Sequence, residues 1–401
     1  MSDIRTSADF MQIPSRHDYK YGHKIELLRS GESFFAACEK TIDEAKQYIH
    51  FQTYIVDDDE TGRRIVNALI RAAKRGIRVY FLLDAYGGNS FSKDLINKVE
   101  EAGILFRLFS PRLITNGFQL SLRLHHKVLL ADGNTAVIGG MNIADRYRGN
   151  DGLKAWLDFA ILIKGPECSH ILFILKSLWN KAFISKKERS RETIHHPVLY
   201  IEDVKLKVTQ NNWYRNKIEI LKSYRSALKH AQTRMTIFAS YFLPGRSERR
   251  LLRNASRRGV DIKIVLSAES DAPVFKRATN FLYDFILRNN ITIYEYLPSN
   301  LHAKVATVDG NWSTIGSYNM NHLSDYGSIE MNADILDTRF AEMFEEILLG
   351  IIEKDCRQVT PEEYIHRKTW IFQLTGWFSY QMIRISMRLM FALAAKRSPI
   401  P

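Results

Sequence analysis

The chain has 401 residues, 45% of them hydrophobic and 25% charged, which is ordinary for a globular protein with one large core or two medium ones. Its net charge of +13 suits an anionic partner, but it does not choose between a lipid surface and nucleic acid. The three cysteines are far apart and match no metal spacing, so no disulfide framework is expected.

Residues 1–24 form an N-terminal extension without the apolar run of a signal peptide, so we expect neither a signal peptide nor an N-terminal membrane anchor. Residues 25–184 form a first half in which helix and strand patterns alternate. Helices are predicted at residues 32–46, 59–75, 92–102 and 168–183. Strands are predicted at residues 48–56, 77–84, 104–109, 125–130, 135–139 and 159–164.

A polar, charged stretch within residues 185–204 indicates a surface linker. Residues 205–355 form a second half that repeats the order of the first. Helices are predicted at residues 217–231, 246–258 and 276–289, and strands at residues 235–242, 260–267 and 291–296, followed by a hairpin. Gly76 and Gly259 end corresponding helices. We therefore predict an α/β fold of two duplicated halves, each a mixed sheet flanked by helices.

One pattern of histidine, lysine and aspartate occurs twice, as His125-x-Lys127-x4-Asp132 and as His302-x-Lys304-x4-Asp309. In each copy a glycine lies seven residues after the aspartate and an asparagine ten residues after it: Gly139 and Asn142, then Gly316 and Asn319. A single copy would be weak evidence, since such a pattern arises by chance in a chain of this length. Two copies with the same trailing residues indicate a duplicated site.

These residue types suit attack on a phosphodiester, which needs a nucleophile, a proton donor for the leaving alkoxide, and positive charge around the phosphoryl oxygens. The two histidines can divide the first two tasks, and the lysines and asparagine amides can surround the oxygens. Asp158 and Asp334 follow the histidines by 33 and 32 residues and are candidates to orient the imidazoles. Neither half holds the complete set, so the halves should meet across a pseudo-twofold axis, with the site at their seam.

The two motifs resemble those of the phospholipase D superfamily, whose hallmark is two HxKxxxxD motifs, each followed by Gly-x-x-Asn. Within it, LHHKVLLADGNTAVIGGMNIADRY and LHAKVATVDGNWSTIGSYNMN are similar to the motifs of bacterial cardiolipin synthases. Residues 51–88 and 240–244 extend the resemblance, which covers residues 25–345. The chain is most similar to the short branch that lacks N-terminal membrane helices.

The resemblance implies a metal-independent phosphatidyltransferase that needs no cofactor. It favours His125 as the nucleophile that attacks phosphorus to form a phosphohistidine, with His302 donating a proton to the departing alcohol; the near-symmetry of the two motifs leaves the reversed roles open. With phosphatidylglycerol as both donor and acceptor, the products would be cardiolipin and glycerol. The resemblance also makes Asp132 and Asp309, which each precede a glycine in a tight turn, structural residues. The expected catalytic set is His125, Lys127, Asn142, Asp158, His302, Lys304, Asn319 and Asp334.

The sequence departs from the family pattern at several positions. Gly140 stands where the second copy has Ser317, so only one half offers a hydroxyl near the phosphate. Gln52 replaces a glutamate that is common in the first strand motif, and Asp158 and Asp334 are shorter than the glutamates often found at their positions. A shorter carboxylate must come from closer backbone to reach an imidazole.

The C-terminal segment, residues 356–401, contains a strongly apolar stretch at residues 370–395. At about 100° per residue, one sector holds Gln373, Gln381, Arg384 and Arg388, and a stripe of Ile371, Leu374, Phe378, Met382, Ile385 and Leu389 lies opposite. Two arginines near the middle make a bilayer-spanning helix costly. We expect a helix in the membrane interface, with the body of the protein or a dimer interface as the alternative partner.

Two other activities remain open: phospholipid hydrolysis, in which water replaces the acceptor alcohol, and cleavage of nucleic acid by the same fold. A dead-site binding protein is disfavoured because both motifs are intact. The apolar C-terminal stretch favours anionic phospholipid over nucleic acid as the partner. We therefore expect a peripheral protein on the cytoplasmic side of a bacterial cell membrane. The donor lipid, the acceptor alcohol and the oligomeric state do not follow from the sequence.

Overall fold

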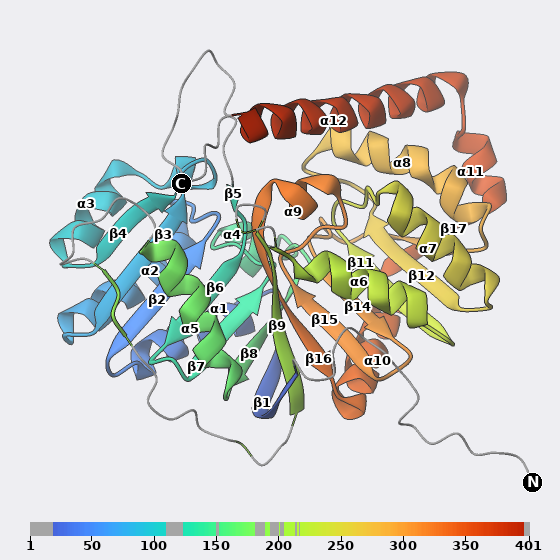
Figure 1. Cartoon of the computed structure of the whole chain (residues 1–401). Helices are drawn as coiled ribbons and strands as arrows, with labels where there is room; N and C mark the ends of the chain where they lie inside the picture. The colour runs from blue at the N-terminus through green and yellow to red at the C-terminus, as the bar shows by residue number, and fades with distance from the viewer. Residues whose placement is uncertain are drawn as a thin grey trace, which may run out of the picture.

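The computed structural model describes residues 19–109, 123–149, 152–180, 189–192, 200, 204–212, 215 and 217–396. Two halves of similar architecture lie side by side (Figure 1). Each half is a mixed β-sheet with helices on both faces, which confirms the predicted α/β fold.

The first half begins with β1 (Lys20–Arg29). Its helices are α1 (Glu32–Glu44), α2 (Glu60–Lys74), the short 3-10 helix η2 (Gly87–Ser90), α3 (Lys93–Glu101), α4 (Asp145–Arg148) and α5 (Glu167–Trp179). Its other strands are β2 (Tyr48–Thr53), β3 (Arg78–Asp84), β4 (Leu105–Phe109), β5 (Arg123–Leu124), β6 (Lys127–Ala131), β7 (Thr135–Gly139) and β8 (Phe159–Lys164). The bounds of α2 follow from its sequence, because the Asp59 carboxylate caps the first turn and Gly76, with a φ of 85°, follows the last.

The second half repeats this order. Its strands are β9 (Val204–Asn212), β10 (Lys217–Ile218), β11 (Arg234–Ala239), β12 (Asp261–Ser267), β13 (Thr292–Tyr296), β14 (Lys304–Val308), β15 (Trp312–Gly316) and β16 (Ser328–Leu336). Its helices are α6 (Glu219–His230), α7 (Arg246–Arg257), α8 (Pro273–Leu287), α9 (His322–Tyr326) and α10 (Thr338–Asp355). The chain continues through β17 (Cys356–Val359), α11 (Pro361–Arg367) and α12 (Trp370–Lys396).

The two sheets have the same strand order and are joined at their inner edges. The first runs β4-β3-β2-β6-β7-β8-β1, and the second runs β13-β12-β11-β14-β15-β16-β9. Strand β1 pairs antiparallel with β9, and β5 of the first half pairs parallel with β16 of the second. The seam is therefore a set of main-chain hydrogen bonds as well as a packing contact.

A single apolar core crosses the seam. Helices α5 and α10 cover corresponding faces of the two sheets, and their buried side chains belong to one cluster with residues of β8, β9 and β16. The rings of Phe159 in β8 and Phe344 in α10 meet edge-on, with centroids 5.3 Å apart. The opposite faces are covered by α1, α2 and α3 in the first half and by α6, α7 and α8 in the second, each with its own core.

The motif aspartates hold equivalent turns in the two halves. The carboxylate of Asp132 accepts hydrogen bonds from the backbone N–H groups of residues 46, 47 and 48, at 2.8, 2.8 and 3.0 Å. The carboxylate of Asp309 accepts them from residues 232, 233 and 234, at 2.9, 2.8 and 3.0 Å. Both aspartates have a φ of 51°. They fix the start of β2 and of β11, as a structural role requires.

The linker prediction is only partly open to comparison, because most of residues 185–204 lies outside the described residues. Within residues 189–192, Ser190 and Glu192 contact the first half, whereas Arg189 and Arg191 are exposed. Ser190 is buried and exchanges hydrogen bonds with Asn180, and the Glu192 carboxylate pairs with Arg78.

Helix α12 lies along α8 (Figure 1), so it packs on the body of the protein through one face. Gly376, Ser379 and Ile383 are buried on that face, and a Cβ at Gly376 would lie 3.2 Å from the backbone oxygen of Arg277. The rings of Phe281 and Tyr380 are 5.5 Å apart. Five residues of the predicted apolar stripe are exposed: Ile371, Leu374, Phe378, Met382 and Ile385. Within the described residues, no helix is long and apolar enough to cross a membrane.

Candidate active site

The two HxKxxxxD motifs face each other across the seam. Each histidine lies two residues before a hairpin strand, β6 or β14, and its backbone N–H is bound by the other half. The N–H of His125 donates to the carbonyl of Ile329 at 2.9 Å, and that of His302 donates to the carbonyl of Leu157 at 2.8 Å. Each motif is therefore positioned by the half that does not contain it.

Each imidazole is paired with a carboxylate from the opposite half. Nδ1 of His302 lies 2.6 Å from an oxygen of Asp158, and Nδ1 of His125 lies 2.9 Å from an oxygen of Glu330. Both carboxylates are fully buried, whereas the two imidazoles retain slight exposure. With Nδ1 engaged, Nε2 is the nitrogen of each ring that can react.

The structure corrects the expectation that Asp334 orients a histidine. Asp334 instead accepts hydrogen bonds from the hydroxyls of Ser223, at 2.6 Å, and Thr314, at 2.7 Å, whereas Glu330 contacts His125. It is a buried structural carboxylate, and burial raises its pKa to about 6.

A difference in loop length explains this correction. Twenty-one positions separate Gly139 from its cross-strand partner Ala160, but only sixteen separate Gly316 from Asn332. Asp158 and Glu330 each lie two residues before those partners, so they are the equivalent pair. The similar spacings of 33 and 32 residues from the histidines favoured Asp334, because the sequence does not show where the extra residues lie. A glutamate near the expected position was the available signal.

The two lysines are buried beside their histidines. Nζ of Lys127 donates to the carbonyl of His125 at 2.6 Å, and Nζ of Lys304 donates to the carbonyl of His302. Burial lowers the pKa of Lys127 to about 7 and that of Lys304 to about 8, although Glu330 and Asp158 oppose the shift. A bound phosphodiester is negatively charged and would favour the charged form of both amines.

The asparagines follow β7 and β15 and are also buried. The amide nitrogen of Asn142 donates to the hydroxyl of Tyr147 at 2.9 Å. The side-chain oxygens of Asn142 and Asn319 have no hydrogen-bond partner among the described residues. A buried amide without its full set of partners is costly. Rotating each side-chain amide by 180° would put its NH₂ group where its unpartnered oxygen now lies, and from there it could donate to a phosphoryl oxygen.

The site is not fully symmetric, and Gly140 shows why. A Cβ at Gly140 would lie 2.4 Å from a carboxylate oxygen of Asp158, so only glycine leaves room for this carboxylate. At the equivalent position, the hydroxyl of Ser317 donates to Glu330 at 2.6 Å. The serine hydroxyl, expected near the phosphate, therefore orients a carboxylate instead.

Burial dominates the electrostatics of the histidine–carboxylate pairs. It raises the pKa of Asp158 to about 7. It lowers the pKa of His125 against the opposing effect of Glu330, and it lowers the pKa of His302 further, with help from Lys304 and Lys127. The site therefore disfavours charge until an anion enters it.

Aromatic rings flank the reactive imidazoles, and the sequence did not identify them as site residues. The rings of Tyr54 and His125 lie 4.9 Å apart, and those of Tyr147 and His302 lie 5.2 Å apart, both edge-on. Tyr54 directly follows β2 and lies in the aromatic stretch that was predicted as a strand at residues 48–56. The sequence carries no comparable pattern around Tyr147. These rings limit the orientations of the imidazoles.

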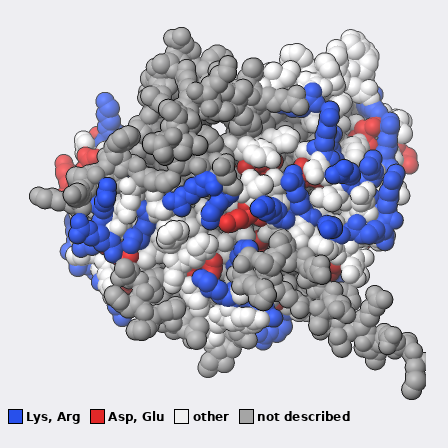
Figure 2. All heavy atoms as spheres, viewed as in Figure 1, with Lys and Arg blue, Asp and Glu red and all other residues white. Residues whose placement is uncertain are grey.

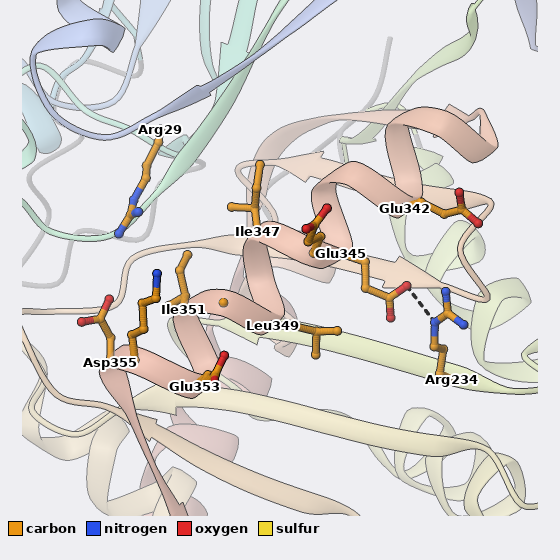
Figure 3. A pocket seen from close by; sticks show the side chains of 12 residues that line it. Arg29, Arg234, Glu342, Glu345, Ile347, Leu349, Ile351, Glu353 and Asp355 are labelled. Carbon is orange, nitrogen blue, oxygen red and sulfur yellow. Dashed lines mark hydrogen bonds and ion pairs between the residues drawn. The ribbon is translucent and has the colours of Figure 1, made fainter.

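Other features lie apart from this seam. A surface hollow on α10, with Arg29 and Arg234 at its edges, contains no motif residue (Figure 3). Gln52 bridges His126 and α5 in the core, and burial lowers the pKa of His126 to about 3, which keeps this imidazole neutral. Among the described residues, no three His, Cys, Asp or Glu side chains are arranged to hold a metal ion.

Comparison with known proteins identifies this arrangement. The family model described as cardiolipin synthase, phospholipase D-like domain, matches residues 39–179 and 224–352, which hold both motifs and both carboxylates. The chain belongs to this family. Cardiolipin synthase B of Escherichia coli strain K12 is 33% identical over 364 residues, covering 88% of this chain and 86% of that protein. Cardiolipin synthase of Geobacillus sp. strain WCH70 is 28% identical, covering 85% and 68%.

The fold has a solved counterpart. The crystal structure of phosphatidylserine synthase from Haemophilus influenzae superposes with a TM-score of 0.67 at 14% identity, covering 91% of this chain and 94% of that one. At that identity the likeness concerns the fold alone. The predicted membership of the phospholipase D superfamily, in its cardiolipin synthase branch, is confirmed.

Proposed function

We propose that this member of the cardiolipin synthase family transfers a phosphatidyl group from one phosphatidylglycerol to another, giving cardiolipin and glycerol. One observation carries the proposal: two imidazoles from different halves, each bound at Nδ1 by a buried carboxylate, flank one seam. Curated relatives of nearly the same length are named cardiolipin synthase, which supports the choice of lipid over nucleic acid.

The proposed reaction has two steps. Nε2 of His125 attacks phosphorus, and the bond between phosphorus and the headgroup glycerol oxygen breaks. His302 donates a proton to that oxygen, so free glycerol leaves. His302 then removes a proton from a headgroup hydroxyl of the second phosphatidylglycerol. The oxygen of that hydroxyl attacks phosphorus and displaces His125. Lys127, Lys304, Asn142 and Asn319 stabilise the phosphoryl oxygens in both steps. Because the seam is nearly symmetric, the alternative is that His302 is the nucleophile and His125 transfers the protons.

The same site would hydrolyse phospholipid if water reached the phosphohistidine before the second lipid did. Transfer and hydrolysis therefore differ in the acceptor and not in the residues that carry the chemistry. We propose that the protein acts at the cytoplasmic surface of a bacterial membrane, because its proposed substrate is a membrane phospholipid.

The test measures cardiolipin, phosphatidic acid and glycerol after incubation with phosphatidylglycerol vesicles. Wild type should release one glycerol per cardiolipin, and His125→Ala and His302→Ala should each lower turnover at least 1,000-fold. His126→Ala is the matched control, because His126 adjoins the motif but lies in the core. Phosphatidic acid without cardiolipin would mean hydrolysis instead. Undiminished turnover in both motif variants would remove the mechanism.

A further inference from the structure

Helix α12 turns a continuous apolar stripe away from the protein. Ile371, Leu374, Phe378 and Ile385 are each between 52% and 61% exposed, and Trp370 is 74% exposed. Their spacing of three, four and seven residues places the four aliphatic and phenyl side chains on one face. That face lies opposite the face buried against α8. Contiguous exposed apolar surface of this kind marks an interaction site.

A row of arginines on α7 lies next to α12. Arg246, Arg249, Arg250 and Arg253 project from α7 at one-turn spacing and, with Ser247 and Phe285, line an open groove of about 420 Å³. Figure 2 shows Lys and Arg gathered on this side of the second half, below α12. Within the described part of the chain, none of the four is paired with a carboxylate, whereas Arg225 of α6 is paired with Glu248. Nε of Arg253 is buried without a hydrogen-bond partner.

The groove and the helix form one surface. The guanidinium of Arg249 lies 5.8 Å from the ring centroid of Phe285 and 5.9 Å from that of Tyr380 in α12. Arg384 follows Tyr380 by four residues and so lies on the same side of the helix. Helix α12 has no Asp or Glu. Cationic side chains therefore border the apolar stripe along the flank that faces α7.

We propose that the stripe of α12 and the arginine groove of α7 form one docking face for a bilayer that contains anionic phospholipid. The stripe enters the outer acyl region, Trp370 and Trp377 lie at its border, and the groove holds lipid phosphates. A second copy of the chain fits this surface poorly. A symmetric contact would bring two rows of arginines together without carboxylates to neutralise them.

The position of α12 relates the proposed docking face to the active site at the seam. Helix α12 contacts α9, which follows the loop that carries Asn319, and it lies at the same end of the sheets as α4 and α9 (Figure 1). Docking through α12 would bring the reactive imidazoles close to the lipid surface. The choice of a lipid surface rests on the proposed function, but the binding surface is separate from the catalytic residues.

The test is sedimentation of the full-length protein with vesicles. Wild type should bind vesicles of phosphatidylglycerol and phosphatidylcholine, and added salt should weaken this binding. The double variant Leu374→Gln with Phe378→Gln should partition at least tenfold less. The double variant Arg250→Glu with Arg253→Glu should lose the preference for anionic over neutral vesicles. Matched controls are Phe173→Gln, an exposed phenyl group on α5, and Lys74→Glu with Lys229→Glu, at helix ends away from α12.

Three outcomes overturn the inference: vesicle binding by the stripe variant that equals wild type, an equal effect of the control variants, and a lipid-free dimer that the stripe variant converts to monomer. Turnover of a short-chain, monomeric phosphatidylglycerol separates this inference from the proposed function. The stripe variant should retain that turnover, and His302→Ala should lose it while still binding vesicles. If the wild-type protein binds vesicles but does not turn over this substrate, the proposed function is wrong and the docking face stands.

Discussion

At the scale of single residues, Glu330 and Asp334 present the same chemistry four residues apart in β16, but their surroundings separate their roles. Glu330 binds an imidazole at the seam, and Asp334 binds two hydroxyls in the core of the second half. Identity and approximate spacing cannot distinguish them. The pairing of β15 with β16 does, because it fixes which carboxylate reaches the seam.

Glu330→Gln should therefore lower turnover at least 100-fold, since the amide cannot hold His125 in the reactive tautomer as a carboxylate does. Asp334→Asn is the control in the same strand. It should lower the free energy of unfolding by about 1–3 kcal/mol and leave turnover of the folded protein within about threefold of wild type. Steady-state kinetics and urea unfolding of both variants measure these effects. The reverse ranking would restore Asp334 as the orienting residue.

The pKa of Asp158 predicts a dependence of stability on pH. Burial raises this pKa to about 7, so between about pH 4 and pH 7 the folded protein holds a proton that the unfolded chain has lost. This contribution to stability is complete below about pH 4 and disappears as pH rises through 7. Asp158→Asn cannot ionise and should show a smaller decline across that range, measured by urea unfolding at pH 4.5, 5.5 and 7. An unchanged decline would mean that Asp158 ionises normally in the folded protein.

At the scale of secondary-structure elements, replacing a motif aspartate should lower the free energy of unfolding by a predictable amount. Each accepts hydrogen bonds from three backbone N–H groups at the start of a central strand. Asp132→Ala should lower the free energy of unfolding by about 2–4 kcal/mol, because those N–H groups lose their partner and alanine is disfavoured at a φ of 51°.

Asp132→Asn should recover part of this loss, because asparagine tolerates positive φ and keeps one acceptor oxygen. Urea unfolding gives the stability, and turnover per folded molecule should stay near wild type in both variants. A large loss of turnover in a fully stable Asp132→Ala protein would assign the residue to the chemistry instead.

Sequence patterns predicted most of the alternating helices and strands of both halves, because their buried faces are apolar. Strands β1, β9 and β16 and helix α10 were not predicted, and β9 shows one reason. Its second half is polar but buried, and Asn211 satisfies its amide with the N–H of Ile220 and the carbonyl of Ser324. Hydropathy cannot identify a strand whose polar side chains find partners in other elements. The same limit applied at β16, where only the strand pairing places Glu330.

Helix α12 shows how the sequence supported two interpretations: the structure confirms that the helix packs on the body of the protein, and contact with a membrane stays a prediction. The apolar stripe was predicted correctly, and so was the alternative that the helix packs on the body, because different faces are involved. Gly376 was the clue to the packing face, since a small residue in an apolar helix permits the close approach to α8. Its meaning depends on a partner far away in the sequence.

At the scale of the whole molecule, neither half is an independent unit. Strands β1 and β9 pair across the seam, one apolar core includes both α5 and α10, and each histidine depends on a carboxylate from the other half. The duplicated halves therefore share one folding unit as well as one active site. Motif repetition predicted the shared site, but the shared core could not be inferred from it.

This shared core predicts a single cooperative unfolding transition for the described body of the protein. Phe344→Ala removes the ring that contacts Phe159 across the seam, and it should lower the free energy of unfolding by about 3–5 kcal/mol. Hydrogen exchange should then accelerate equally in β3 of the first half and in β12 of the second, because both open in the same event. Calorimetry should show one peak in wild type and in the variant. If protection were lost only in the second half, the two halves would be separate folding units joined at the active site.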